Sequence, residues 1–107
     1  MHPTILERKA RWTAFLDGAP DAPRHLFILR LPNPDAPNVG YRMHWPGCED
    51  LRIDWAWSHY QTAMHRLDWL DDDSIPHLNL ITGTEIFAEA LGCEIERPED
   101  NMPFAKP

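Results

Sequence analysis

Two short apolar runs, separated by helical patterns, constrain the fold of this chain most strongly. The first is HLFILRL at residues 25–31, and the second is the segment 77–81. The first run is apolar almost throughout, which is typical of a strand covered on both faces, as in parallel sheets. Strands that alternate with helices are expected to pair in parallel through right-handed crossovers. The pattern therefore predicts an α/β fold.

Apolar residues at helical spacing predict three helices around these runs. The first is expected over 3–17, where Gly18 is placed to end it, and the second over 49–70. The third is expected over 83–91, followed by a third extended piece over 93–97. The chain thus reads as an N-terminal helix followed by two to three parallel strand–helix units.

A proline-rich stretch separates the first run from the second helix. Residues 32–47 contain four prolines and two glycines, which is too many for a continuing sheet or helix. We expect a long loop there, with hydrogen-bond donors and ring faces supplied by Tyr41, Arg42, His44 and Trp45. Tyr41 and Trp45 either pin the loop to the body of the domain or serve a function.

Charge and hydropathy exclude several classes of partner. The formal net charge is −7, with 17 acidic against 10 basic residues, and the longest basic cluster is the short one at residues 8–11. A duplex-binding surface needs a concentrated basic stripe, so we expect no nucleic-acid partner. No apolar run approaches the roughly 20 residues that span a bilayer, so no membrane partner is expected and a cytoplasmic location is the default.

No metal site is expected from residue spacing. Cys48 and Cys93 lie far apart without a CxxC pattern, so they are expected to be unpaired thiols. His59 and His65 fall on different faces of their helix. The acids of 71–73 are interpreted as a solvated helix end rather than a cation site.

The segment Thr82-Gly83-Thr84-Glu85 stands where the second apolar run meets the third helix. It fits the T-x-x-E capping box, in which the Thr82 hydroxyl accepts from the amide of Glu85 and the Glu85 carboxylate returns to the amide of Thr82. A helix N-terminus directly after a parallel strand also suits a phosphate or carboxylate. Both interpretations, a structural cap and an anion or substrate contact, stay open at this point.

Two stretches near the C-terminus resemble the uroporphyrinogen decarboxylase-like family. Residues 90–95 read ALGCEI, and residues 103–107 read PFAKP, similar to the A-L-G-x-E-V and P-F-x-x-P pieces of that family. The opening segment 5–29 is also similar to the family's first helix and first strand. Gly83 falls where the decarboxylases carry an aspartate, and their arginine-rich motif after the first strand has no counterpart.

The resemblance implies a fold and an activity. The family fold is a TIM (β/α)8 barrel, which needs about 250 residues, so residues 1–107 would form the N-terminal portion of one incomplete barrel domain. The family includes a decarboxylase and corrinoid-dependent methyltransferases and demethylases. The substrate would be a small-molecule carboxylate, a tetrapyrrole or a methyl donor. Zinc or corrinoid would enter only in the full-length protein. A homo-oligomer is compatible with the resemblance. The chain alone is not expected to catalyse a reaction.

In such a barrel the C-terminal ends of the strands face the active site. The resemblance therefore implies substrate contacts for Arg30, Thr82, Gly83 and Thr84, while no catalytic residue is assigned. Arg30 could hold a substrate carboxylate in a bidentate fork, or equally pair with one of the chain's own acids. Gly83 would permit close approach of the backbone.

A different class of function is also consistent with the sequence. Five tryptophans in 107 residues are many, and aromatic anchors dominate the energetics of protein interfaces. The alternative expectation is a small, self-contained α/β domain that binds a protein partner through its tryptophan-rich loop and helix.

Overall fold

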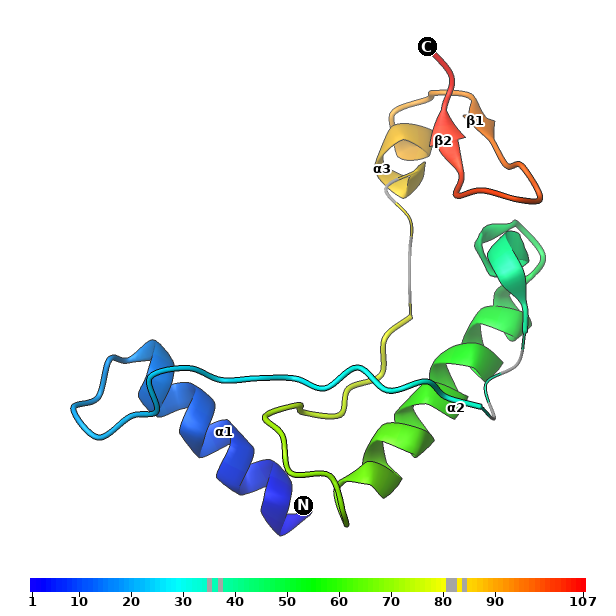
Figure 1. The fold of residues 1–107 in the computed structure, drawn as a ribbon. Helices are drawn as coiled ribbons and strands as arrows, with labels where there is room; N and C mark the ends of the chain where they lie inside the picture. The colour runs from blue at the N-terminus through cyan, green and yellow to red at the C-terminus, as the bar shows by residue number, and fades with distance from the viewer. Residues whose placement is uncertain (35, 37, 81–82, 84) are drawn as a thin grey trace. The chain divides into compact units, whose positions relative to one another are not determined.

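The computed structural model describes residues 1–34, 36, 38–80, 83 and 85–107. They form two compact units, and each is described by itself. The first unit comprises Met1–Pro34 and Tyr60–His77, and the second comprises Asp35–His59 and Leu78–Pro107 (Figure 1).

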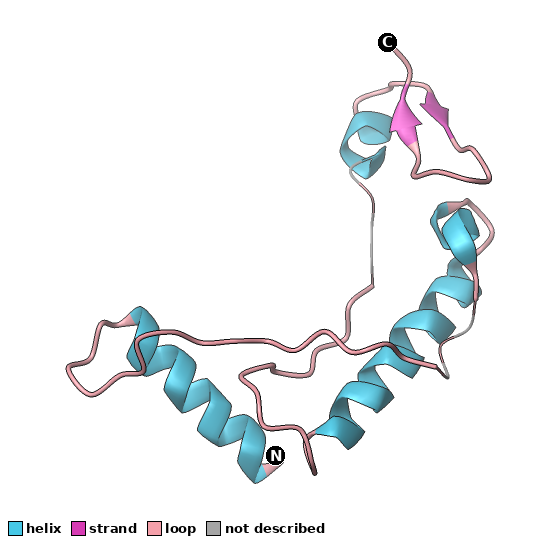
Figure 2. Ribbon diagram, in the orientation of Figure 1, coloured by secondary structure: helices cyan, strands magenta, loops and turns pink. Residues whose placement is uncertain are grey.

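Helices account for most of the regular structure (Figure 2). In chain order the elements are α1 (Pro3–Leu16), a 3-10 helix (Gly40–His44), α2 (Glu49–Arg66), α3 (Glu85–Ala90), β1 (Ile95–Glu96) and β2 (Phe104–Ala105). None of the helices in the described part of the chain is long and apolar enough to cross a bilayer.

The three helices predicted from apolar spacing are confirmed, but their C-terminal ends are shorter than predicted and α3 begins at Glu85 instead of Gly83. The His2 side chain caps α1 by accepting from the amide of Thr4 at 3.3 Å, and Pro3 occupies the first turn. Gly18 follows α1 with φ +65, a backbone conformation that favours glycine. The first turn of α2 carries Glu49 and Asp50, where the helix dipole favours acids.

The predicted parallel strand–helix units, and with them the opening of a TIM barrel, are wrong. Within the described residues the only sheet has two strands, β1 and β2, which pair antiparallel with Ile95 opposite Ala105. Residues 25–31 and 77–80 are extended but belong to no sheet, and residue 81 of the second run lies outside the described residues. The expected third extended piece, 93–97, does contain β1.

The C-terminal hairpin belongs to the second unit, where α3 contacts both strands. The backbone amide of Lys106 donates to the carbonyl of Glu94 at 2.9 Å, and the Lys106 ammonium lies 2.6 Å from the Glu94 carboxylate. Arg97 reaches back to Glu89 on α3 at 2.8 Å. Gly92, with φ +88, turns the chain between α3 and β1.

The two apolar runs do not form a hydrophobic core, as the exposure of their side chains shows. Among the described residues the buried apolar side chains are Ala56, Leu67 and Pro103. The buried polar or charged side chains are Arg8, His44, Asp72, Asp73 and Glu85. Near-continuous apolarity predicted strands covered on both faces, but the side chains of 27–29 are exposed to solvent. The first unit is instead centred on charged groups.

Candidate functional site

Two acids that follow α2 hold the first apolar run in place. One carboxylate oxygen of Asp73 accepts from the amide of Phe27 at 3.0 Å, and one of Asp72 accepts from the amide of Leu29 at 3.0 Å. The amide of Asp73 in turn donates to the carbonyl of Phe27 at 2.9 Å. Side-chain carboxylates therefore take the place that a neighbouring strand would occupy beside residues 27–29.

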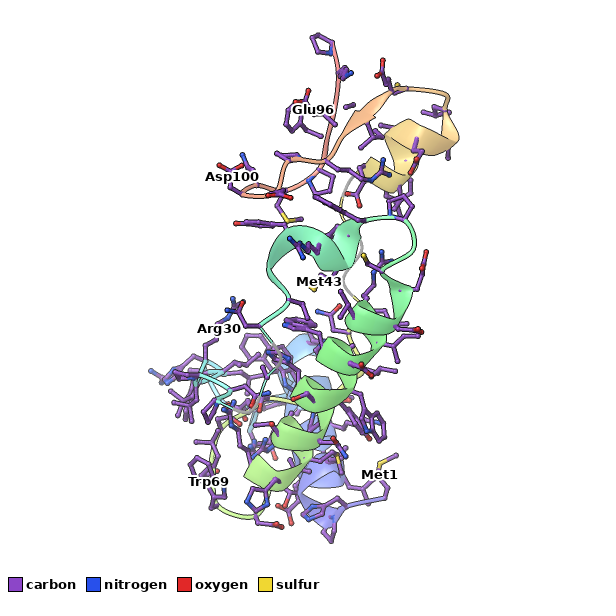
Figure 3. All side chains as sticks on the ribbon, turned by 90° about the vertical axis from the view of Figure 1, so that its right-hand side faces the viewer. Met1, Arg30, Met43, Trp69, Glu96 and Asp100 are labelled. Carbon is purple, nitrogen blue, oxygen red and sulfur yellow. The ribbon has the colours of Figure 1, made fainter. Side chains whose placement is uncertain are left out.

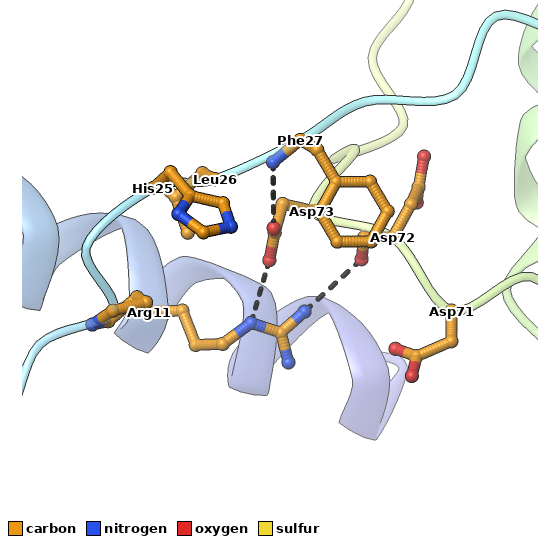
Figure 4. A pocket seen from close by; sticks show the side chains of 8 residues that line it. Arg11, His25, Leu26, Phe27, Asp71, Asp72 and Asp73 are labelled. Atoms are coloured by element: carbon orange, nitrogen blue, oxygen red, sulfur yellow. Dashed lines mark hydrogen bonds and ion pairs between the residues drawn. The ribbon is translucent and has the colours of Figure 1, made fainter.

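Two arginines from α1 neutralise these acids. Arg8 Nη1 lies 2.9 Å from Asp72 Oδ1, and Arg11 Nε lies 2.8 Å from Asp73 Oδ1 (Figure 4 shows the Arg11 contacts). Arg8 also donates to the carbonyl of Ser74 at 2.7 Å and to that of Leu70 at 2.5 Å. Arginine suits this role because its planar fork can serve several acceptors at once.

Arg8, Arg11, Asp72, Asp73 and Ser74 are called the charged cluster below. The interpretation of 71–73 as a solvated helix end is wrong for its second and third acids, since Asp72 and Asp73 are buried. A sequence signal existed: Arg8 and Arg11 are three apart and share one face of their helix. The pairing could not be read from that spacing alone, because it joins residues more than sixty positions apart.

Opposing influences act on Asp72. Burial works to raise the pKa of its carboxyl, but hydrogen bonds from Ser74 and from the amide of Leu29, together with the charge of Arg8, outweigh burial and lower the pKa. The Ser74 hydroxyl donates to Asp72 Oδ1 at 2.7 Å. The carboxylate is thus held ionised inside the first unit.

A hollow of about 270 Å³ adjoins the charged cluster (Figure 4). It is lined by Arg11, Pro23, His25, Leu26, Phe27, Asp71, Asp72 and Asp73. This volume lies just below the range of typical small-molecule pockets. Asp72 and Asp73 in this lining are paired with Arg8 and Arg11, whereas no ion pair joins Asp71 to a described residue.

A second hollow, of about 470 Å³, lies in the second unit. Its lining residues are Asn38, Val39, Gly40, Tyr41, Met43, His44, Trp55 and Met102. Arg52 fastens the 3-10 helix to α2 by donating from Nε to the carbonyl of Met43 at 2.9 Å. Tyr41 and His44, two of the expected donors of the proline-rich loop, therefore line a largely aromatic and thioether surface.

The structure describes two of the four predicted substrate contacts. Arg30 is exposed in the first unit (Figure 3), and no hydrogen bond or ion pair joins its side chain to the described residues. Gly83 lies in the second unit, where the side chain of Glu85 folds over it so closely that a Cβ at residue 83 would collide with the carboxylate. Thr82 and Thr84 lie outside the described residues. The predicted capping box pairs Glu85 with Thr82, so its hydrogen bonds also lie outside the described residues.

The described part of the chain has two free thiols but no cluster of metal ligands. No group of three or more His, Cys, Asp or Glu side chains there is arranged to hold a metal ion. Cys48 and Cys93 are both free thiols, Cys93 being exposed.

Comparison with known proteins does not assign a family. No family model matches the chain, and no curated protein or solved structure matches it significantly. The resemblance carried by residues 90–95 and 103–107 therefore stays a prediction.

Proposed function

We propose that this chain is the amino-terminal part of a uroporphyrinogen decarboxylase-like enzyme and has no catalytic activity by itself. The observation that carries the proposal is the exposure of large apolar side chains on the first run, where Phe27, Ile28 and Leu29 are 51%, 55% and 46% exposed. Apolar surface of this extent is normally covered by further polypeptide. The second run behaves alike, since Leu78 and Leu80 are also exposed.

The two stretches that carry the family resemblance also lie together. ALGCEI ends at Ile95 in β1, PFAKP contains β2, and these strands pair in one hairpin. Two motifs that contact each other support the family resemblance better than two unrelated short matches. Their separation in the sequence is then explained by the hairpin that joins them. This supports a common origin for the segment without defining the reaction.

Arg30 is the proposed substrate contact of the described residues. Its exposed guanidinium can offer a bidentate fork to a carboxylate of a small-molecule acid or tetrapyrrole. A methyl donor is the substrate in the methyltransferase branch. Zinc or corrinoid, where the family uses them, would enter only in the full-length protein. A cytoplasmic location without a nucleic-acid partner belongs to the same proposal.

The test begins with the coding DNA beyond Pro107. We expect an open frame that continues with further coding sequence, and the longer polypeptide should show decarboxylase or methyltransferase activity that residues 1–107 lack. Within it, Arg30→Ala should raise KM about tenfold or more, and Arg24→Ala, a neighbouring exposed arginine, serves as the control. A frame that adds no further polypeptide, or equal activity of both polypeptides, would refute the proposal.

The second unit favours one other candidate, a protein-interaction domain. The specific observation is its hollow of about 470 Å³, which is built from the proline-rich loop, Trp55 of α2 and Met102. Amide exchange and light scattering on residues 1–107 separate the two candidates. A monomer with cooperative, strongly protected amides favours the interaction domain, whereas weak protection and self-association favour the enzyme part.

A further inference from the structure

The first apolar run has one occupied edge. The amides of Phe27 and Leu29 donate to the acids of the charged cluster, and the carbonyl of Phe27 accepts from the amide of Asp73. Further along, the carbonyl of Leu31 accepts from Arg66 Nη1 at 3.3 Å. Between 27 and 31, the backbone groups that bond to another described residue thus all belong to odd-numbered residues.

The even-numbered residues present the opposite edge. In an extended chain, successive residues direct their N–H and C=O groups to opposite sides. No hydrogen bond joins the backbone groups of Leu26, Ile28 or Arg30 to any other residue that the structure describes. Pro23 and Pro32, which lack an N–H donor, bracket this stretch. We call the backbone groups of these three residues the free edge.

A free edge of this kind accepts an added strand. Unpaired N–H and C=O groups in a row form a template for pairing with another extended chain, and alternate side chains add apolar contacts. Ile28, in the middle of the free edge, is 55% exposed, so its side chain is accessible to such a neighbour. The occupied edge keeps residues 27–31 extended and so lowers the entropic cost of docking.

Charge indicates what kind of strand fits. Arg24 and His25 stand at one end of the run and Arg30 at the other, all three exposed. No ion pair joins any of them to a described acid. Segment 24–31 itself carries two arginines and no acid, and Asp71 is the unpaired carboxylate that lines the same hollow as His25 and Leu26. A docked strand with carboxylates near its ends would be favoured at the two arginines.

We propose that the free edge of residues 26–30 is a docking site for an extended apolar segment of a partner polypeptide whose ends carry acidic side chains. The inference rests on the hydrogen-bond pattern and on the unpaired side chains of Arg24 and Arg30, and it gives Ile28 and Arg30 a different occupant from the one in the enzyme proposal. A strand that docks here adds to one side of the run and leaves the charged cluster intact.

The test uses the whole chain and a seven-residue peptide of alternating valine and threonine with glutamate at both ends. In the free chain, NMR-detected exchange should be faster at the amides of Leu26, Ile28 and Arg30 than at those of Phe27 and Leu29. Saturating peptide should protect the first group. Ile28→Pro removes a free-edge donor that the fold does not use and should weaken binding at least about tenfold. Ile28→Val keeps that donor and should bind like the parent.

A charge arm completes the test. Replacing both glutamates of the peptide by lysine should weaken binding, and Arg24→Glu should reduce the preference for the acidic peptide. Equal binding of both peptides, or binding that Ile28→Pro leaves unchanged, overturns the proposal. Protection of the free edge that grows with chain concentration in the absence of peptide also overturns it, because the occupant would then be a second copy. Enzymatic activity plays no part in these readouts.

Discussion

Arg8 and Asp72 form a buried ion pair in which Nη1 lies 2.9 Å from Oδ1 and the two side chains are 3% and 0% exposed. Removing one partner of such a pair leaves an uncompensated charge in a poorly solvated place. Arg8→Met should therefore lower the free energy of unfolding of the first unit by about 3–5 kcal/mol. Urea unfolding followed by circular dichroism measures this loss.

Lys9→Met provides the matched control for that variant. Lys9 is the next residue on α1, is exposed, and makes only a 4.0 Å contact to a methionine sulfur. Its replacement should leave the urea midpoint nearly unchanged. Equal effects of the two variants would contradict a stabilising role for the buried pair.

The first unit should lose stability in acid because of Asp72. Hydrogen bonds and Arg8 hold the folded-state pKa of Asp72 below its usual value of 3.8 despite the opposing effect of burial. Its ionised form therefore stabilises the fold above that value, and the contribution is lost as the pH falls through the lower folded pKa. Urea midpoints measured from about pH 6 down to about pH 2 should decline at the acid end.

Asp72→Asn separates this effect from general acid denaturation. The variant should be less stable at neutral pH and should show a shallower decline in acid, since the titrating group is gone. Asp54→Asn, at an exposed position on α2, should retain the parent's slope. An unchanged slope in Asp72→Asn would refute the assignment.

The protection of the Phe27 amide in the first apolar run should depend on Asp73 and be independent of Asp71. Asp73 accepts from the amide of Phe27 at 3.0 Å and donates to its carbonyl, whereas no hydrogen bond or ion pair of the Asp71 side chain reaches a described residue. Asp73→Ala should raise the exchange rate of the Phe27 amide about tenfold, in line with the loss of a charge-assisted hydrogen bond. Asp71→Ala should leave it unchanged, and the opposite order would show that the run is held by other contacts.

Gly83 and Glu85 should be energetically coupled. A Cβ at residue 83 would collide with the Glu85 carboxylate, and Glu85 is 5% exposed, so the side chain has little room to yield. Gly83→Ala should therefore destabilise α3 in the parent but much less in a Glu85→Ala background. A coupling of about 1 kcal/mol is expected from amide exchange of α3 across the double-mutant cycle. Additive effects would show that the glycine serves another purpose.

The sequence predicted the helices better than the sheet, for a physical reason. Apolar spacing, Pro3 and Gly18 act within a few residues, so α1 could be located almost to its ends. The pairing of an extended run depends on distant groups. Here the partners of residues 27–29 are carboxylates more than forty positions away, and no periodicity in 25–31 distinguishes them from a neighbouring strand.

The candidate site was predicted only in part for the same reason. Tyr41 and His44 were expected to supply contacts from the proline-rich loop, and both line the hollow of the second unit. Trp55 and Met102, which complete it, come from α2 and from the segment before β2. Their convergence is a long-range property that apolar spacing along α2 could not reveal.

One edge of residues 27–31 is occupied by acidic side chains instead of by a neighbouring strand. This arrangement limits how many strands can stack on the run. Fibril growth by strand stacking requires every extended segment to pair above and below. Here one edge of the run is already occupied by the Asp72 and Asp73 side chains, which form ion pairs with arginines of α1. When a strand pairs with the free edge, the opposite edge of the run is unavailable to a further strand. Assembly through these residues therefore ends at a single pair.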